Sequence, residues 1–278
     1  MKCKKIDGIF SIQVANNLET RLSAYQLVYK SYLKKGLINK RTQHKLWVSE
    51  FNALATTMTL LIKKNKRIIG TITLILDSPI GLPTDSIYKQ ENDKLRHSKM
   101  KLAELSSLAL DASKNHEALF LMARFLNYAY LIALYGLSGK KATDFVISVN
   151  PRYENFYKRF FLFEKIGGFR YYGWVNNAPA ILLKLDVETI QNHMPLKNAP
   201  QGTGPDHSPL LYKYFHKKQE EEEFVHFLKE SHKPWSKEEF RYFLKGKADI
   251  LENTTLDKKQ SLKKFIPEYL WKPLLTAN

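Results

Sequence analysis

The run Leu102-Ala-Glu-Leu-Ser-Ser-Leu-Ala-Leu110 decides the fold, because it is an apolar strand pattern with an acid inside it. Side chains alternate between the two faces of a strand. One face is predicted to hold Leu102, Glu104, Ser106 and Leu108, and the other Ala103, Leu105, Ser107 and Ala109. A carboxylate in such a strand must be paired, solvated or protonated, so its pKa is readily shifted. Glu104 is therefore a candidate proton acceptor, and an edge strand with a solvated face is the alternative.

Length and composition predict a folded protein with a sizeable core. The chain has 278 residues, of which 44% are hydrophobic and 13% aromatic, enough for one large domain with an appendage or for two small domains. Its single cysteine, Cys3, leaves no internal disulfide, and no apolar signal region follows the basic N-terminus. We therefore expect a cytoplasmic protein.

The net charge of +17 lies mostly in residues 1–190 and favours an acidic partner. Nucleic acid, an anionic membrane and an acidic carrier protein all have the required charge. No nucleic-acid-binding motif accompanies the basic residues, so we expect no nucleic-acid partner.

The region before the Glu104 strand is expected to contain helix and a hairpin. Helical spacing extends to about Leu46, and Gly36 after a lysine pair indicates a helix stop. The runs Met58–Lys63 and Arg67–Asp77 predict an antiparallel hairpin. Prolines and glycine in residues 79–83 then indicate an irregular segment.

After the Glu104 strand, residues 115–137 form the most apolar run of the chain. Arg124 and Asn127 interrupt it, and a charge at a bilayer midplane costs about 3 kcal/mol on insertion scales, so we expect a buried helix. The remaining pattern is a strand, a helix and two strands: Asp144–Val149, a helix from Asn150-Pro151 to near Gly167-Gly168, Arg170–Val175 and Ala178–Leu185. This order predicts one α/β domain around a mixed sheet.

The C-terminal part is predicted to be separate and helical. Residues 195–209 contain four prolines and two glycines and are interpreted as a linker between a domain of residues 1–194 and an extension of residues 210–278. Within the extension, Ser236-Lys-Glu-Glu239 fits a capping box, and 262–275 is apolar. The sequence gives the extension no role.

Four segments carry a family resemblance through their order and spacing. They are Arg21–Tyr25 with Gly36-Leu-Ile38, Leu102–Ser107, Val149-Asn-Pro-Arg152 running into Phe156-Tyr157, and Val175–Ala180. Together, over roughly residues 10–190, they resemble the FeeM-type N-acyl amino acid synthases. Those synthases belong to the GNAT acyltransferase superfamily and are related to acyl-homoserine lactone synthases.

The resemblance implies a GNAT-like mixed central sheet, splayed between its two central strands and flanked by helices, with a C-terminal helical extension. A fatty acyl thioester would lie in the gap, and the amine of an amino acid would attack its carbonyl. The implied donor substrate is an acyl-phosphopantetheine arm on acidic acyl carrier protein, with no permanently bound cofactor. The resemblance leaves open a peripheral membrane contact through the basic surface or the lipid product.

A missing glycine loop independently favours the carrier-protein donor. Acetyl-CoA-dependent relatives bind pyrophosphate with a glycine-containing loop between the fourth strand and the next helix. The corresponding stretch here, Asp111-Ala-Ser-Lys-Asn-His116, has no glycine, and Asp111 would repel a pyrophosphate.

The resemblance also implies two catalytic roles. Glu104 would act as the general base that takes a proton from the amine, with a structural or substrate-orienting role as the alternative. Tyr157 would protonate the departing thiolate, with packing as the alternative.

Further residues are candidates for binding. The substrate-binding candidates are Arg21, Tyr25, Ser106, Ser107, Asn150, Arg152 and Asn177. Among them, Arg152 suits a phosphate or a carboxylate. The carrier-docking candidates are Lys140, Lys141, Lys158 and Arg159. Each of these residues has an ordinary packing or surface role as its alternative. The histidines lack metal-ligand spacing, so no metal site is predicted.

The leading hypothesis is therefore an N-acyltransferase that joins a medium or long fatty acyl group from acyl carrier protein to an amino acid. The alternatives are an autoinducer synthase that makes acyl-homoserine lactones, and an inactive GNAT-like scaffold that acts as an interaction module.

Overall fold

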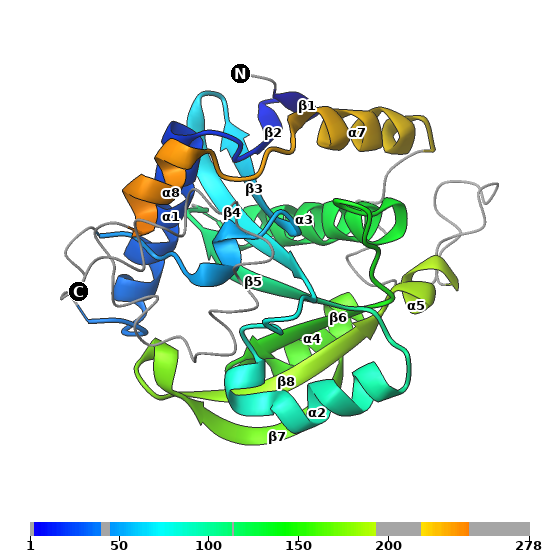
Figure 1. The fold of residues 1–278 in the computed structure, drawn as a ribbon. Coiled ribbons are helices and arrows are strands. Elements are labelled where there is room, and N and C mark those ends of the chain that lie inside the picture. The colour runs from blue at the N-terminus through cyan, green and yellow to red at the C-terminus, as the bar shows by residue number, and fades with distance from the viewer. Residues whose placement is uncertain (1–2, 40–44, 113, 193–217, 245–278) are drawn as a thin grey trace.

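The computed structural model describes residues 3–39, 45–112, 114–192 and 218–244. Within them, one mixed sheet has eight strands in the order β1-β2-β3-β4-β5-β6-β8-β7 (Figure 1). The strands are β1 (Lys4–Asp7), β2 (Phe10–Val14), β3 (Thr57–Lys64), β4 (Arg67–Leu76), β5 (Leu102–Leu110), β6 (Asp144–Val149), β7 (Glu164–Tyr172) and β8 (Ala178–Asp186). The expected α/β fold around a mixed sheet is confirmed.

The sheet opens between its two parallel central strands. β5 and β6 pair at only three positions, from Leu102 opposite Asp144 to Glu104 opposite Val146. β6 nevertheless stays paired with β8 as far as Val149. The strands therefore separate immediately after Glu104, which confirms the expected splay.

A β-bulge on β5 changes which side chains share a face. Thr73 of β4 pairs with Ser106 but Thr71 pairs with Ala109, and Ser107 between them has a φ of 54°. The alternation predicted from sequence is wrong beyond this point, because a bulge inserts one residue and reverses the parity. Leu108 consequently packs in the same core cluster as Leu105.

Helices cover both faces of the sheet. On one face lie α3 (Asn115–Tyr135), α4 (Glu154–Phe161), α5 (Val187–Asn192) and α7 (Lys218–Ser231), whose apolar side chains share one core cluster with the strands. On the other lie α1 (Leu18–Lys34), α2 (Asp85–His97) and α8 (Lys237–Leu244), with the 3₁₀ turn η1 (Glu50–Ala53). The turns η2 (Pro151–Tyr153) and η3 (Gly173–Val175) flank the open end of β6 and β8. Figure 1 shows α8 beside α1, and α3 crossing behind β4 and β5.

α3 is the buried helix that the sequence predicts. By length and composition it is apolar enough to cross a membrane, but two-thirds of that stretch, 67%, is buried inside the protein. Arg124 at its centre lies over the ring of Tyr128 and donates to the carbonyl of Ile6. The helix is therefore a core element that covers the sheet.

The structure differs from the sequence expectations in three places. α1 ends at Lys34, close to the predicted stop at Gly36 and not at about Leu46, and two strands that were not predicted precede it. Residues 85–97, for which the sequence pattern predicted no element, form a helix in which Tyr88 is buried and Arg96 ion-pairs with Asp85. α4 stops at Phe161, since Leu162 takes a left-handed conformation, and residues 164–172 are strand instead of helix end.

Residues 218–244 pack onto the rest of the fold. Phe224 of α7 stacks on Tyr128 of α3, and Phe243 of α8 contacts Tyr25 of α1. The capping box expected at Ser236 and Glu239 is present, with hydrogen bonds in both directions. The linker 195–209 and the apolar segment 262–275 lie outside the described residues.

Candidate active site

A cavity of about 560 Å³ lies where β5 and β6 separate. Its walls differ on the two faces of the sheet. The α1 and α2 side contributes polar and aromatic side chains, namely Tyr32, Trp47, Ser49, Asn52, Glu104, Tyr172 and Trp174. The α3 side contributes apolar ones, namely Ile72, Met122, Leu126, Ile147, Phe161 and Phe163. One continuous space thus offers a polar half and an apolar half.

Glu104 stands at the point of separation with only 3% of its surface exposed. Its Oε2 accepts hydrogen bonds from the backbone N–H and the hydroxyl of Thr84, both at 2.8 Å. Burial raises the pKa of Glu104 to about 8; the Thr84 hydrogen bonds oppose this shift, and the charge of Asp85 adds to it. A carboxylate with such a pKa can both take up and release a proton near neutral pH.

Tyr32 and Tyr172 flank Glu104 and were not among the sequence candidates. Burial raises the pKa of each tyrosine, and the nearby Glu104 raises it further, so both hydroxyls stay neutral. The ring of Tyr32 packs on Trp47 at 5.1 Å, and the Tyr172 hydroxyl donates to the carbonyl of Pro83 at 3.1 Å. Only the aromatic richness of the chain hints at this group, because its members come from distant segments.

Six sequence candidates line the same cavity as Glu104: Ser106, Ser107, Asn150, Arg152, Tyr157 and Asn177. Burial raises the pKa of Tyr157 to about 12, so its phenol remains a proton donor. The Asn150 side chain accepts from the Arg152 backbone N–H and caps η2, while the Arg152 guanidinium lies 4.8 Å from the Tyr153 ring.

Asn177 lies in the exposed turn between β7 and β8, in a left-handed conformation. Its neighbour Asn176, also left-handed, donates to the carbonyl of Gly36 at 3.3 Å. This contact joins the turn to the end of α1 at the cavity wall.

Arg21 and Tyr25 do not line this cavity. Arg21 forms a buried ion pair with Glu239 of α8 and donates to the carbonyl of Lys233. Tyr25 is buried against Phe243, and burial raises its pKa to about 12. Arg21 and Tyr25 lie away from the cavity because α8 covers their side of α1.

The four docking candidates lie near opposite ends of β6. Lys158 and Arg159 are exposed on α4, which follows the open end of β6. Lys140 and Lys141 precede the other end of β6, about 16 Å away along a six-residue strand. Lys140 donates to the carbonyl of Asp77 at 3.1 Å. The structure therefore places Lys140 and Lys141 away from the open end of the cavity.

Among the described residues, no group of three or more His, Cys, Asp or Glu side chains could hold a metal ion.

The two central strands separate, a buried carboxylate lies at the point of separation, and a cavity lies between the strands. These features define an acyltransferase with a GNAT-like fold. The model of the N-acyl amino acid synthase FeeM family matches residues 23–186, more than half of the chain. The chain belongs to this family, as its sequence motifs predict.

Several solved structures are similar to this chain. That of FeeM, an N-acyl amino acid synthase from uncultured soil microbes, has 28% sequence identity and a TM-score of 0.53, covering 64% of this chain and 92% of that chain. The acyl-homoserine lactone synthase LasI has 13% identity and a TM-score of 0.44, covering 64% and 90% of the two chains. The CoA-dependent acyl-homoserine lactone synthase MesI has 12% identity and a TM-score of 0.44, covering 63% and 88%. No curated protein matches the sequence.

Proposed function

We propose that this acyltransferase moves a medium or long fatty acyl group from acyl carrier protein to the amine of an amino acid. The observation that carries the proposal is Glu104 at the separation of β5 and β6, between the polar and apolar halves of one cavity. The polar half would hold the amino acid and the apolar half the acyl chain.

Glu104 acts as the general base. An amino acid amine is largely protonated at neutral pH, so it must lose a proton before it can attack a carbonyl. The ionised Glu104 carboxylate accepts that proton, and the nitrogen then forms its bond to the thioester carbon. Beyond Glu104, β5 and β6 are not paired in the described structure, which leaves backbone groups free to polarise the carbonyl oxygen.

The second proton that the ammonium loses ends up on the departing thiol. As the carbon–sulfur bond breaks, the thiolate takes a proton from the Tyr157 hydroxyl, which regains one from the new amide nitrogen. Burial supports this role because it keeps Tyr157 protonated. The products are the N-acyl amino acid, the free thiol and the proton on Glu104.

Acyl carrier protein is preferred over CoA as the donor for two reasons. The stretch that follows β5 and leads into α3 has no glycine with which to cradle a pyrophosphate. Exposed Lys158 and Arg159 on α4 lie at the open end of β6, where an acidic carrier would approach. Repulsion of a pyrophosphate by Asp111 carries less weight than the sequence suggests, because Arg67 pairs with Asp111.

No resident cofactor is needed, and the enzyme would work in the cytoplasm with Cys3 as a free thiol.

The test is the product profile of bacteria that express the chain, measured by mass spectrometry of organic extracts beside a Glu104→Gln strain. New N-acyl amino acids that depend on Glu104 would support the proposal. Acyl-homoserine lactones would overturn the acceptor assignment. With purified protein, acyl-CoA used as readily as acyl carrier protein would overturn the donor assignment.

A further inference from the structure

Glu104 is held by a buried polar chain that begins on α2. Thr84, directly before this helix, directs both its backbone N–H and its hydroxyl to Oε2 of Glu104. The Thr84 hydroxyl also accepts a hydrogen bond from Nδ2 of Asn92 at 3.0 Å. Thr84 and Asn92 are both fully buried and do not line the cavity, so they act on Glu104 from behind.

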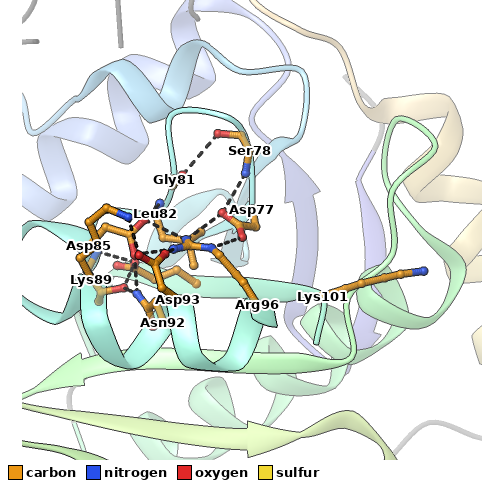
Figure 2. A network of polar contacts seen from close by, with 12 residues as sticks. Asp77, Ser78, Gly81, Leu82, Asp85, Lys89, Asn92, Asp93, Arg96 and Lys101 are labelled. Atoms are coloured by element: carbon orange, nitrogen blue, oxygen red, sulfur yellow. Dashed lines mark hydrogen bonds and ion pairs between the residues drawn. The ribbon is translucent and has the colours of Figure 1, made fainter. Parts of the chain in front are cut away.

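The orientation of the Asn92 amide is fixed by Asp85. Nδ2 of Asn92 lies 2.7 Å from Oδ1 of Asp85, and a carboxylate oxygen accepts hydrogen bonds, so the amide must present its nitrogen there. Asp85 is itself fixed by the guanidinium of Arg96 at 2.8 Å and by the backbone N–H of Leu82 at 3.0 Å. Figure 2 shows this network of α2 and the loop before it, with Arg96 between Asp77, Asp85 and Asp93.

The Asn92 carbonyl oxygen has no hydrogen-bond partner among the described residues. Leaving a buried acceptor unpaired costs free energy of folding. The amide keeps this orientation because the flipped one would set its oxygen against the Asp85 carboxylate. The structure therefore tolerates an unpaired oxygen in order to aim Nδ2 at both Asp85 and Thr84.

The orientation of the Asn92 amide affects Glu104 through the hydroxyl of Thr84. Since the Thr84 oxygen already accepts from Asn92, its hydrogen is turned toward Glu104. We propose that Asn92 and Thr84 are positioning residues, which fix the Glu104 carboxylate at the opening of the sheet and stabilise its ionised form. This inference rests on the proposed role of Glu104 as the base.

Of the other groups near Glu104, Asp85 on α2 favours its neutral form through its negative charge. Tyr32 on α1 and Tyr172 on β7 also lie near Glu104, but they stay neutral and add no charge. Arg96 offsets the charge of Asp85 by pairing with it. The two Thr84 hydrogen bonds thus work against burial and the Asp85 charge, and losing one of them should favour the protonated acid.

The test follows Glu104 itself rather than activity alone. In protein labelled with ¹³C at glutamate carboxyls, the resonance of Glu104 is assigned by its absence in Glu104→Gln and followed as a function of pH. Thr84→Val keeps the shape and the backbone donor but removes the hydroxyl. We expect its titration midpoint to rise by about one pH unit, the value of one hydrogen bond to a charged group.

Three further variants sharpen the test. Asn92→Ala frees the hydroxyl to rotate and should raise the midpoint by less, and Thr84→Ser should restore the parental midpoint. Thr143→Val is the matched control, because it removes a threonine hydroxyl that donates at 2.6 Å to the buried Asp144 at the far end of β6. It should leave the Glu104 midpoint unchanged.

The outcomes separate this inference from the proposed function. An unchanged Glu104 midpoint in both Thr84→Val and Asn92→Ala overturns the positioning role, whatever happens to catalysis. If the titration midpoint of Glu104 rises and the pH profile of acyl transfer shifts to higher pH by a similar amount, both proposals are supported. If the midpoint rises but the pH profile does not shift, the positioning role is supported and the assignment of Glu104 as the base is wrong.

Discussion

Arg21 of α1 and Glu239 of α8 form an ion pair whose side chains are only 4% and 6% exposed. Glu239 also accepts from the backbone N–H of Ser236, so the same carboxylate caps α8 and holds α1. The last turn of α1 leads to Tyr32 and Lys35, which line the cavity. A segment beyond the family match therefore supports a wall of the candidate active site.

Glu239→Gln should destabilise the protein strongly. Removing one partner of a buried ion pair leaves the other charge uncompensated and costs about 3–5 kcal/mol. Thermal unfolding would measure the loss, with Glu238→Gln, an exposed neighbour on the same helix, as the control. Equal melting temperatures for the two variants would show that the pair contributes little.

Glu104→Gln should reduce acyl transfer by about 10²- to 10⁴-fold, the usual contribution of a general base. Because the base must be ionised and its pKa is about 8, parental kcat/KM should rise with pH up to about 8 and then level off. For Glu104→Gln, kcat/KM should not show this rise with pH, the rising limb of the profile. Steady-state rates between pH 6 and 9 provide the measurement, with exposed Glu164→Gln as the control. A variant that keeps the limb would point to another base.

The buried Glu104 should also make stability depend on pH. Its pKa is 4.5 ordinarily and about 8 in the folded protein, so between these values the folded state binds more protons than the unfolded one. The free energy of unfolding should therefore fall, relative to that of Glu104→Gln, as pH rises from about 4.5 to about 8, and the difference should be level above that. Urea unfolding at several pH values measures it. Parallel stability curves would mean that Glu104 titrates normally.

Carrier docking should depend on α4 and not on the turn before β6. Charge reversal of Lys158 and Arg159 should raise KM for acyl carrier protein, most strongly at low salt, because electrostatic steering is screened by ions. The same reversal of Lys140 and Lys141 should leave KM unchanged, since these residues lie at the other end of β6. The reverse ranking would place the carrier at the end of β6 where Lys140 and Lys141 lie.

Met122→Trp should shorten the preferred acyl chain. Met122 of α3 is partly buried and lines the apolar half of the cavity, so a larger side chain would fill space that the acyl tail uses. Competition between acyl donors of different length, read by mass spectrometry, tests this, and Met122→Leu, which conserves volume, should leave the preference in place. An unchanged preference in the tryptophan variant would put the tail elsewhere.

The sequence alone determined the features that local patterns encode. The apolar run with Glu104 predicted the central strand, and 115–137 predicted the buried α3, because periodicity and hydrophobicity act over neighbouring residues. The motifs around Glu104 and Tyr157 predicted the family that the comparisons then showed. The Ser236–Glu239 capping box was readable because its partners lie three residues apart.

Tertiary structure decided what depends on contacts between distant segments. The bulge at Ser107 arises from pairing with β4 and reverses the faces that alternation predicts. Arg21 lies outside the candidate site because it pairs with Glu239 of α8. Glu104 is hydrogen-bonded to Thr84, which lies directly after the segment that was expected to be irregular. A strand pattern can show that a carboxylate is buried, but its hydrogen bonds and its pKa depend on side chains that only the fold brings within 3 Å.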